Sequence, residues 1–157
     1  MEKSFIKKII TVKELENLYE DILKIYSDDN NKYGHALDLK HDLHLIMKSL
    51  SHESLLLWNT HVWAHFNGEI WDSIFIGLIR KSEKFNKKVM DEYIWLSKNS
   101  NIGFSLYKEA YQYAKSQKCE YIFMNVTENH PKSEKIKKIY NLLGFTKDTE
   151  SYVKKID

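Results

Sequence analysis

The stretch that decides the fold is Lys98–Lys115, KNSNIGFSLYKEAYQYAK. It follows an apolar run, Tyr93–Leu96, whose composition predicts a buried strand. Within the stretch, Ile102, Leu106 and Ala110 recur at helical spacing. The sequence therefore predicts a strand that turns directly into a helix.

The turn between this strand and helix is built from small and polar residues: Ser97, Asn99, Ser100, Asn101 and Gly103. Free backbone N–H groups at a helix start, together with the positive end of the helix dipole, suit a phosphate group. Gly103 would let a ligand approach the backbone closely. A connecting turn with no ligand explains the same residues equally well, so the downstream sequence has to decide.

Downstream, the chain repeats the alternation of strand and helix. Tyr121–Val126 is a mostly apolar run that suits a strand covered on both faces, and Asn129–Pro131 breaks the chain after it. A second amphipathic helix places four apolar residues on one face: Ile136, Ile139, Tyr140 and Leu143. Gly144 followed by Phe145 is a typical helix stop, and Ser151–Ile156 predicts a last strand.

This order of elements resembles the GNAT N-acetyltransferase superfamily. The residues that carry the resemblance are Lys98–Gly103, KNSNIG, and Tyr140–Phe145, YNLLGF. The acetyl-CoA loop of that family has the pattern Gln/Arg-x-x-Gly-x-Gly/Ala. With Gly103 in the last position, Lys98 stands where Gln or Arg is usual, and Asn101 stands where the first glycine is usual. The resemblance covers about Leu55 to Ile156 and looks most like the divergent copies in bacteriophage genomes.

The resemblance implies an α/β, single-domain GNAT-like fold over residues 1–157, with a mixed central β-sheet flanked by helices. Residues 1–50 would form a strand and two helices, 51–97 antiparallel strands, and 98–157 the acetyl-CoA loop, a helix–strand–helix unit and the last strand. The pyrophosphate of acetyl-CoA would sit on the loop, and its pantetheine arm in a gap where the fourth and fifth strands splay. The implied cofactor-binding residues are Leu96, Lys98, Asn99, Ser100, Asn101, Ile102, Gly103, Phe104 and Asn125.

The departures from the family loop can be accommodated. Asn101 has a Cβ atom but tolerates left-handed dihedrals better than most residues. Lys98 offers positive charge, although without the fork of an arginine.

Acetyl transfer to an amine requires a base for the amine and an acid for the departing thiolate. Family members often use a carboxylate on the fourth strand and a tyrosine on the last helix, and Tyr140 matches the tyrosine position. Asp91 and Glu92 lie on the strand in question, where alternation sends them to opposite faces, and Glu92 is the slightly preferred base. Tyr140 packed in the core, and either carboxylate exposed to solvent, are the competing interpretations. The acceptor would be a small-molecule or protein amine.

A second hypothesis comes from a different class of protein. The missing glycine at position 101, the lysine at position 98 and a shortened lead-in to the loop also suit a GNAT-like domain that has lost catalysis. Such a domain would act as a binding or assembly module, for example in a bacteriophage particle, with a homo-oligomer or a virion protein as partner.

The N-terminal half supplies the remaining elements. Phe5–Ile10 predicts a short strand, and Thr11-x-x-Glu14 is a capping-box signature. The helix behind it carries Leu15, Leu18, Ile22 and Ile25 on one face. Ser27–Gly34 predicts a loop and Asp38–Leu50 a helix.

A strand hairpin is predicted next. Leu55–Phe66 and Glu69–Arg80 read as strands joined by the Asn67-Gly68 turn dipeptide, and Val89–Ser97 forms the strand that leads into the phosphate turn.

Composition limits the class of protein. The 157 residues carry 24 basic and 22 acidic side chains, a balance that does not call for a nucleic-acid partner. The single cysteine, Cys119, suits a reducing compartment such as the cytoplasm. No signal peptide and no membrane-spanning run is expected. His41 and His44, and His61 and His65, are spaced as pairs without a Cys or carboxylate at ligand spacing, so no metal site is expected.

Overall fold

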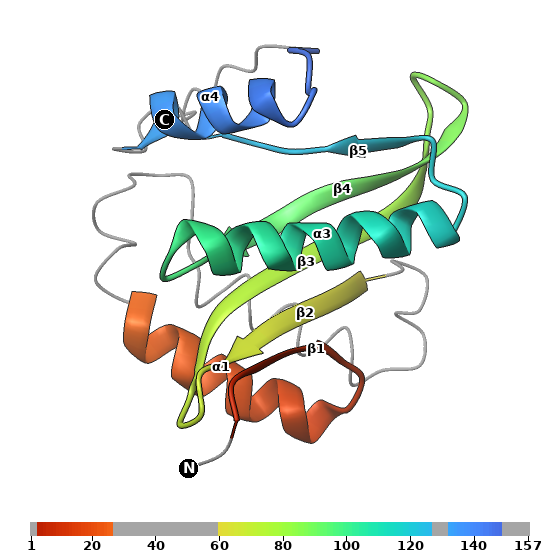
Figure 1. Cartoon of the computed structure of the whole chain (residues 1–157). Coiled ribbons are helices and arrows are strands. Elements are labelled where there is room, and N and C mark those ends of the chain that lie inside the picture. The colour runs from red at the N-terminus through yellow and green to blue at the C-terminus, as the bar shows by residue number, and fades with distance from the viewer. Residues whose placement is uncertain (1–2, 27–59, 127–131, 149–157) are drawn as a thin grey trace, which may run out of the picture. The chain divides into compact units, whose positions relative to one another are not determined.

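The computed structural model describes residues 3–26, 60–126 and 132–148. The chain divides into two compact units, Met1–Asn125 and Val126–Asp157. In the first unit lie β1 (Phe5–Ile9), α1 (Val12–Tyr26), β2 (Thr60–Phe66), β3 (Trp71–Ser82), β4 (Lys87–Leu96), α3 (Ser100–Ser116) and β5 (Tyr121–Phe123) (Figure 1). In the second unit lies α4 (Ser133–Leu142).

The first unit is built on one mixed β-sheet with the strand order β1-β2-β3-β4-β5. Strands β1 to β4 are antiparallel to their neighbours, whereas β5 runs parallel to β4. A parallel neighbour requires a crossover connection, and α3 supplies it between β4 and β5 (Figure 1). The predicted mixed sheet flanked by helices is confirmed.

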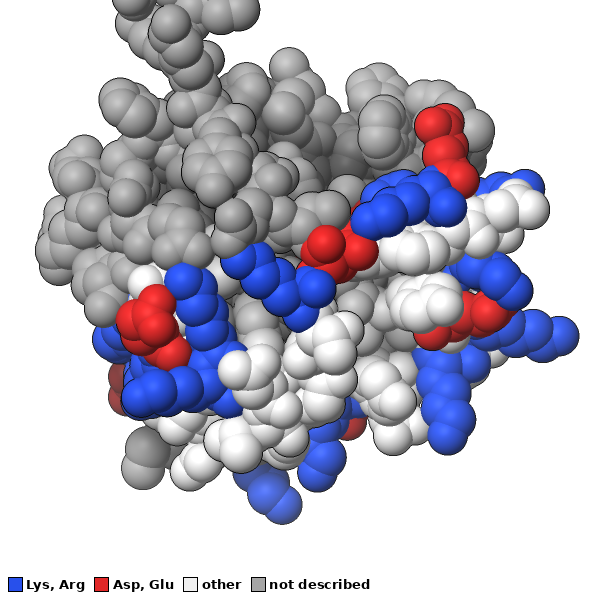
Figure 2. All heavy atoms as spheres, turned by 90° about the horizontal axis from the view of Figure 1, so that it is seen from above, with Lys and Arg blue, Asp and Glu red and all other residues white. Residues whose placement is uncertain are grey.

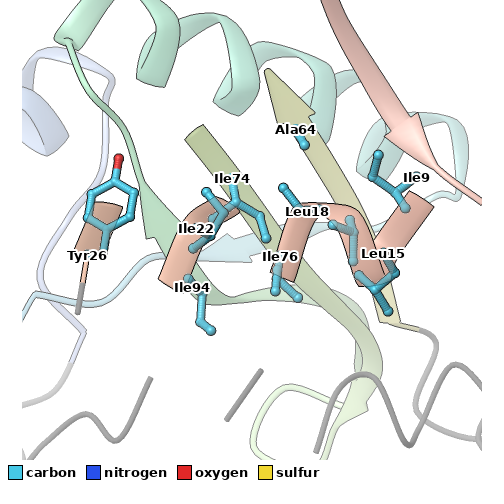
Figure 3. Close-up of a cluster of buried hydrophobic side chains, with 10 residues drawn as sticks. Ile9, Leu15, Leu18, Ile22, Tyr26, Ala64, Ile74, Ile76 and Ile94 are labelled. Carbon is cyan, nitrogen blue, oxygen red and sulfur yellow. The ribbon is translucent and has the colours of Figure 1, made fainter. Parts of the chain in front are cut away.

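Helix α1 covers one face of this sheet. Its start is the predicted capping box: the Glu14 N–H donates to Thr11 Oγ1 at 3.2 Å, and the Thr11 hydroxyl donates to Glu14 Oε2 at 3.0 Å. The core that α1 makes with the strands in Figure 3 contains Ile9, Leu15, Leu18, Ile22, Tyr26, Val62, Ala64, Ile74, Ile76 and Ile94. The i, i+3, i+7 spacing of Leu15, Leu18 and Ile22 explains why one side of the helix is buried.

Helix α3 packs on the opposite face of the sheet. Neighbouring strand residues point to opposite sides of a sheet, so Val62 belongs to the α1 core while Trp63 contacts α3. Its buried side consists of Gly103, Leu106, Tyr107, Ala110 and Ala114. The strands meet it with aromatic rings. Trp95 lies 6.2 Å from Tyr107, and Trp63 lies 5.5 Å from Tyr113, between ring centroids.

The hairpin between β2 and β3 differs from the prediction in its turn. β3 begins at Trp71 rather than Glu69, so four residues separate the strands. Asn67 explains the longer loop: its Oδ1 accepts the N–H groups of Glu69 at 3.0 Å and Ile70 at 3.1 Å. An asparagine side chain that mimics a backbone turn thus replaces the two-residue turn.

The other strand boundaries differ modestly from prediction. β4 begins at Lys87 and ends at Leu96, and β5 ends at Phe123 instead of Val126. The predictions for Ser27–Gly34, Asp38–Leu50, residues 55–59 and Ser151–Ile156 lie outside the described residues.

Helix α4 ends with the predicted glycine stop. Gly144 has φ of 84°, its N–H donates to the Asn141 carbonyl at 3.1 Å, and the Phe145 N–H donates to the Tyr140 carbonyl at 3.0 Å. These bonds define a Schellman motif, and the rings of Tyr140 and Phe145, 5.4 Å apart, make its hydrophobic contact.

A matched pair of isoleucine variants tests the α1 core. Ile22 is fully buried and Ile10 is 77% exposed. We expect Ile22→Ala to lower the free energy of unfolding by roughly 2–5 kcal/mol, because it leaves a cavity against the sheet. Ile10→Ala should change it by no more than about 0.5 kcal/mol. Urea denaturation of both variants measures the difference, and equal losses would contradict the assignment of this core.

Candidate functional site

Strand β4 contains an irregularity at the centre of the first unit. Ile94 pairs with Ile76 and Glu92 pairs with Gly77, so Tyr93 is an extra residue that has no counterpart on β3. A β-bulge of this kind bends its strand and re-aims the side chains around it. Ile94 accordingly joins the α1 core, while Trp95 lies beneath α3.

The pairing between β4 and β5 is short. It joins Val89–Asp91 to Tyr121–Phe123 and stops there, whereas β4 continues to Leu96. Among the described residues, none pairs as a strand with the last part of β4 on its β5 side. Two aromatic rings on these strands pack against other rings: Trp95 lies against Phe75 and Tyr107, and Phe123 stacks on Phe85 at 5.8 Å.

Glu92 lies at the point where this pairing ends. One of its carboxylate oxygens accepts the backbone N–H of Asn125 at 2.9 Å, and the Asn125 side-chain amide donates to the Glu92 carbonyl at 2.9 Å. Desolvation raises the pKa of the Glu92 carboxyl to about 7, even though the backbone N–H and the side-chain amide of Asn125 act to lower it. A carboxyl group with this pKa can gain and lose a proton at neutral pH.

The neighbouring carboxylate, Asp91, has a different role. It forms an ion pair with Arg80 on β3. The two neighbouring carboxylates therefore have different partners, Arg80 for Asp91 and Asn125 for Glu92.

The turn after β4 has a well-defined hydrogen-bonding pattern. Asn99 is the N-cap of α3, and its Oδ1 accepts the Ile102 N–H at 3.0 Å. The Lys98 N–H donates to the Ser73 hydroxyl at 3.2 Å, which ties the turn to β3. No described residue accepts a hydrogen bond from the N–H of Ser100 or Asn101. The N–H groups of Ser100 and Asn101 are therefore the ones in this turn that could donate hydrogen bonds to a phosphate.

Gly103 has a packing role that the sequence did not suggest. A Cβ atom at this position would lie 3.1 Å from Ser97 Cβ and 3.5 Å from Trp95 Nε1, and the Trp95 indole donates to the Gly103 carbonyl at 3.2 Å. The glycine lets α3 approach the end of β4 closely. The expectation that Gly103 lets a ligand approach the backbone stays a prediction.

Asn101 also differs from expectation. It lies in the first turn of α3, and the described non-glycine residues with positive φ are Asn86 and Lys118. Asn101 therefore has an ordinary right-handed conformation, and its tolerance of left-handed dihedrals is not needed.

The remaining predicted site residues divide between the two units. Phe104 is 39% exposed, and the Lys108 ammonium lies 5.5 Å from the centre of its ring. Leu96 packs partly buried against the α1 core. The N–H and the side-chain amide of Asn125 both donate hydrogen bonds to Glu92. Tyr140 belongs to the second unit, where it is 9% exposed and packs against Phe145.

Some contacts of the site could not be anticipated from the sequence. The bond between Glu92 and Asn125 and the bond between Lys98 and Ser73 join residues that are far apart in the chain. His65, considered only as half of a histidine pair, hydrogen-bonds to Asp72 and Ser4 instead. No local sequence pattern signals such long-range partners.

Charges on the described surface lie in mixed groups. In Figure 2 acidic side chains lie among the basic ones. The ion pairs join Lys7 to Glu14, Arg80 to Asp91, Lys87 to Glu120 and Lys137 to Glu134. Within the described ranges, no cluster of three or more His, Cys, Asp or Glu side chains could hold a metal ion. Over the same residues, no helix has the length and apolar character needed to cross a membrane.

With this geometry in view, comparison with solved structures defines the class of fold. An aminoglycoside acetyltransferase from an uncultured soil metagenomic sample superposes with a TM-score of 0.69 at 10% identity, covering 98% of this chain and 97% of that one. A ribosomal-protein-alanine N-acetyltransferase from Brucella melitensis gives 0.67 at 11% identity, covering 99% and 100%. A GNAT family acetyltransferase from Staphylococcus aureus gives 0.64 at 13% identity, covering 99% and 100%.

The chain therefore has the fold of GNAT acetyltransferases, as its sequence predicted. No protein-family model matches the sequence, and no curated protein matches it. The identities are low, so the likeness concerns the fold, and function has to be argued from the site.

The raised pKa of Glu92 predicts a pH-dependent stability. The folded protein keeps the Glu92 proton up to a pH of about 7, whereas the unfolded chain releases it near 4.5. Stability should therefore fall as the pH rises between these values. Between pH 5 and pH 8 the free energy of unfolding of the wild type should fall by a value on the order of 3 kcal/mol because of Glu92, and Glu92→Gln should lack this fall.

Urea denaturation at several pH values measures this difference. Glu109→Gln, at an exposed position on α3, serves as the matched control and should keep the wild-type slope. If Glu92→Gln and wild type lose stability in parallel, the carboxyl group is not desolvated.

Proposed function

We propose that the protein transfers an acetyl group from acetyl-CoA to an amine acceptor, with Glu92 as the base. The observation that carries this proposal is Glu92 itself. A carboxyl group with a pKa of about 7 lies on β4, where the β4–β5 pairing ends, and the same strand leads into the start of α3. The likeness to the fold of GNAT acetyltransferases supports this chemistry by analogy.

The start of α3 is the proposed binding site for the pyrophosphate. The N–H groups of Ser100 and Asn101, the positive end of the α3 dipole and the Lys98 side chain all favour an anion. Asn99 and Ile102 support this seat through the cap that orders the first turn. Phe104, Leu96 and Asn125 are the proposed contacts for the rest of acetyl-CoA.

Acetyl-CoA would supply a reactive thioester, so the protein has only to position the amine and move protons. Glu92 would take the proton from the amine nitrogen as the nitrogen–carbon bond forms. The carbon–sulfur bond then breaks, and Tyr140 would donate its hydroxyl proton to the departing thiolate. A small-molecule amine and the amine of a protein are both compatible with this scheme. The names of two structural neighbours mention aminoglycosides and ribosomal-protein alanine, and these acceptors belong to those proteins.

The rival hypothesis is a GNAT-like binding or assembly module without catalysis, including one from a bacteriophage particle. Two features favour it: Asn125 already uses its donors on Glu92, and a Cβ-bearing residue occupies position 101. Acetyl-CoA binding separates the two hypotheses.

A binding experiment tests the pyrophosphate seat without disturbing the fold. Asn101→Glu places a carboxylate in the first turn of α3, where it suits the helix dipole but repels a pyrophosphate. Asn101→Gln has the same shape without the charge. Calorimetric titration with acetyl-CoA should show a loss of at least about tenfold in affinity for Asn101→Glu and little change for Asn101→Gln.

The titration also has outcomes that count against the proposal. Equal affinity in Asn101→Glu and Asn101→Gln would place the ligand elsewhere. No binding to folded wild type at millimolar acetyl-CoA would favour the non-catalytic module.

The proposed acid and base predict different kinetic effects. In wild type, kcat/KM should rise with pH and level off above pH 7, because Glu92 acts when deprotonated. Glu92→Gln should remove this rise together with most activity, whereas Tyr140→Phe should lower kcat with little change in acetyl-CoA affinity. Release of the coenzyme A thiol with a panel of small amines and lysine peptides measures both. An unchanged rate in Tyr140→Phe would leave Tyr140 with a packing role alone.

A further inference from the structure

A line of hydrogen-bonded polar side chains crosses the sheet from β1 to β3. The Ser4 hydroxyl, just before β1, lies 2.8 Å from Nε2 of His65 on β2. The other ring nitrogen of His65, Nδ1, lies 2.7 Å from Asp72 Oδ1 on β3. A serine, a histidine and a carboxylate in this order have the geometry of a nucleophilic triad.

The direction of these bonds follows from the buried carboxylate. A carboxylate can only accept hydrogen bonds, so when His65 is neutral its proton lies on Nδ1, facing Asp72. In that tautomer Nε2 accepts the hydrogen bond of the Ser4 hydroxyl. Ser73 reinforces this direction, because its hydroxyl donates to Asp72 Oδ1 at 3.0 Å while accepting the Lys98 N–H at 3.2 Å.

Burial distinguishes the two ends of the line. The side chains of His65 and Asp72 are 8% and 9% exposed, which protects their hydrogen bond from water. Ser4 is exposed. In the described part of the sheet, β1 has a neighbour strand on one side only, and the exposed Ser4 precedes this strand. A buried base with an accessible hydroxyl is the arrangement that activates a serine.

The geometry points to Ser4 as a nucleophile, activated by His65 and oriented through Asp72, that accepts an acyl group from small activated esters or thioesters. This activity is separate from acetyl transfer at Glu92 and does not depend on it. No group of the proposed acetyl-CoA site takes part, apart from the Lys98 backbone N–H that supports Ser73.

The reaction balances without an added cofactor. Ser4 Oγ forms a bond to the acyl carbon while His65 Nε2 takes the hydroxyl proton. The bond from the acyl carbon to the leaving oxygen or sulfur breaks, and His65 returns the proton to that atom. Water, deprotonated by His65 in the same way, then releases the acid and restores Ser4.

An alkyl fluorophosphonate is a direct probe, because an activated serine displaces its fluoride. We expect one adduct on intact wild-type protein, located at Ser4 by peptide mass spectrometry. Ser4→Ala should abolish the adduct, His65→Gln should slow it by at least about a hundredfold, and Ser116→Ala should leave it unchanged. No adduct, an adduct at another residue, or equal rates in wild type and folded His65→Gln would overturn the proposal.

A second variant keeps the test decisive if His65→Gln does not fold. Ser4→Cys in a Cys119→Ser background places a thiol beside Nε2 of His65. That thiol should react with iodoacetamide at pH 7 at least about tenfold faster than Cys119 of wild type, whose pKa is raised by burial. Equal or slower alkylation would show that His65 does not act as a base at this position, and would overturn the proposal.

Discussion

The extra residue in β4 is the constraint on which the rest of the first unit depends. Because Tyr93 has no counterpart on β3, the side chains after it change faces relative to an uninterrupted strand. Ile94 can then enter the α1 core while Trp95 supports the start of α3 from the other side. Glu92, which pairs with Gly77 directly before this irregularity, accepts the Asn125 N–H through its carboxylate.

The contacts of Trp95 link the fold to the candidate site. Its indole donates to the Gly103 carbonyl, and a Cβ atom on Gly103 would lie 3.1 Å from Ser97 Cβ, closer than ordinary contact. The first turn of α3 is thereby pressed against the end of β4, and Asn99 completes it with a side-chain cap. A ligand at this turn would meet a surface that is already ordered, so little conformational entropy would be lost on binding.

Local patterns in the sequence were enough to predict most elements. The apolar spacing of Leu15, Leu18 and Ile22 and the Thr11–Glu14 box defined α1, and Gly144 with Phe145 defined the end of α4. The hairpin turn was predicted two residues too short, because the side-chain bonds of Asn67 are not visible in a two-residue signal. The bulge at Tyr93 was missed because it depends on pairing with β3. Alternation placed Asp91 and Glu92 on opposite faces but could not show which of them is the base, because the Arg80 ion pair of Asp91 and the Asn125 bond of Glu92 depend on the folded chain.

The edge of the sheet has a consequence for self-association. An open edge strand invites strands of other molecules, and a short strand with charged residues resists them. β1 has five residues and carries Lys7 and Lys8 at its centre. Lys7 is paired with Glu14, and the Lys8 ammonium lies 3.5 Å from the centre of the Tyr113 ring. A second chain adding to β1 would have to desolvate or displace these ammonium groups, so growth of the described sheet across this edge is disfavoured.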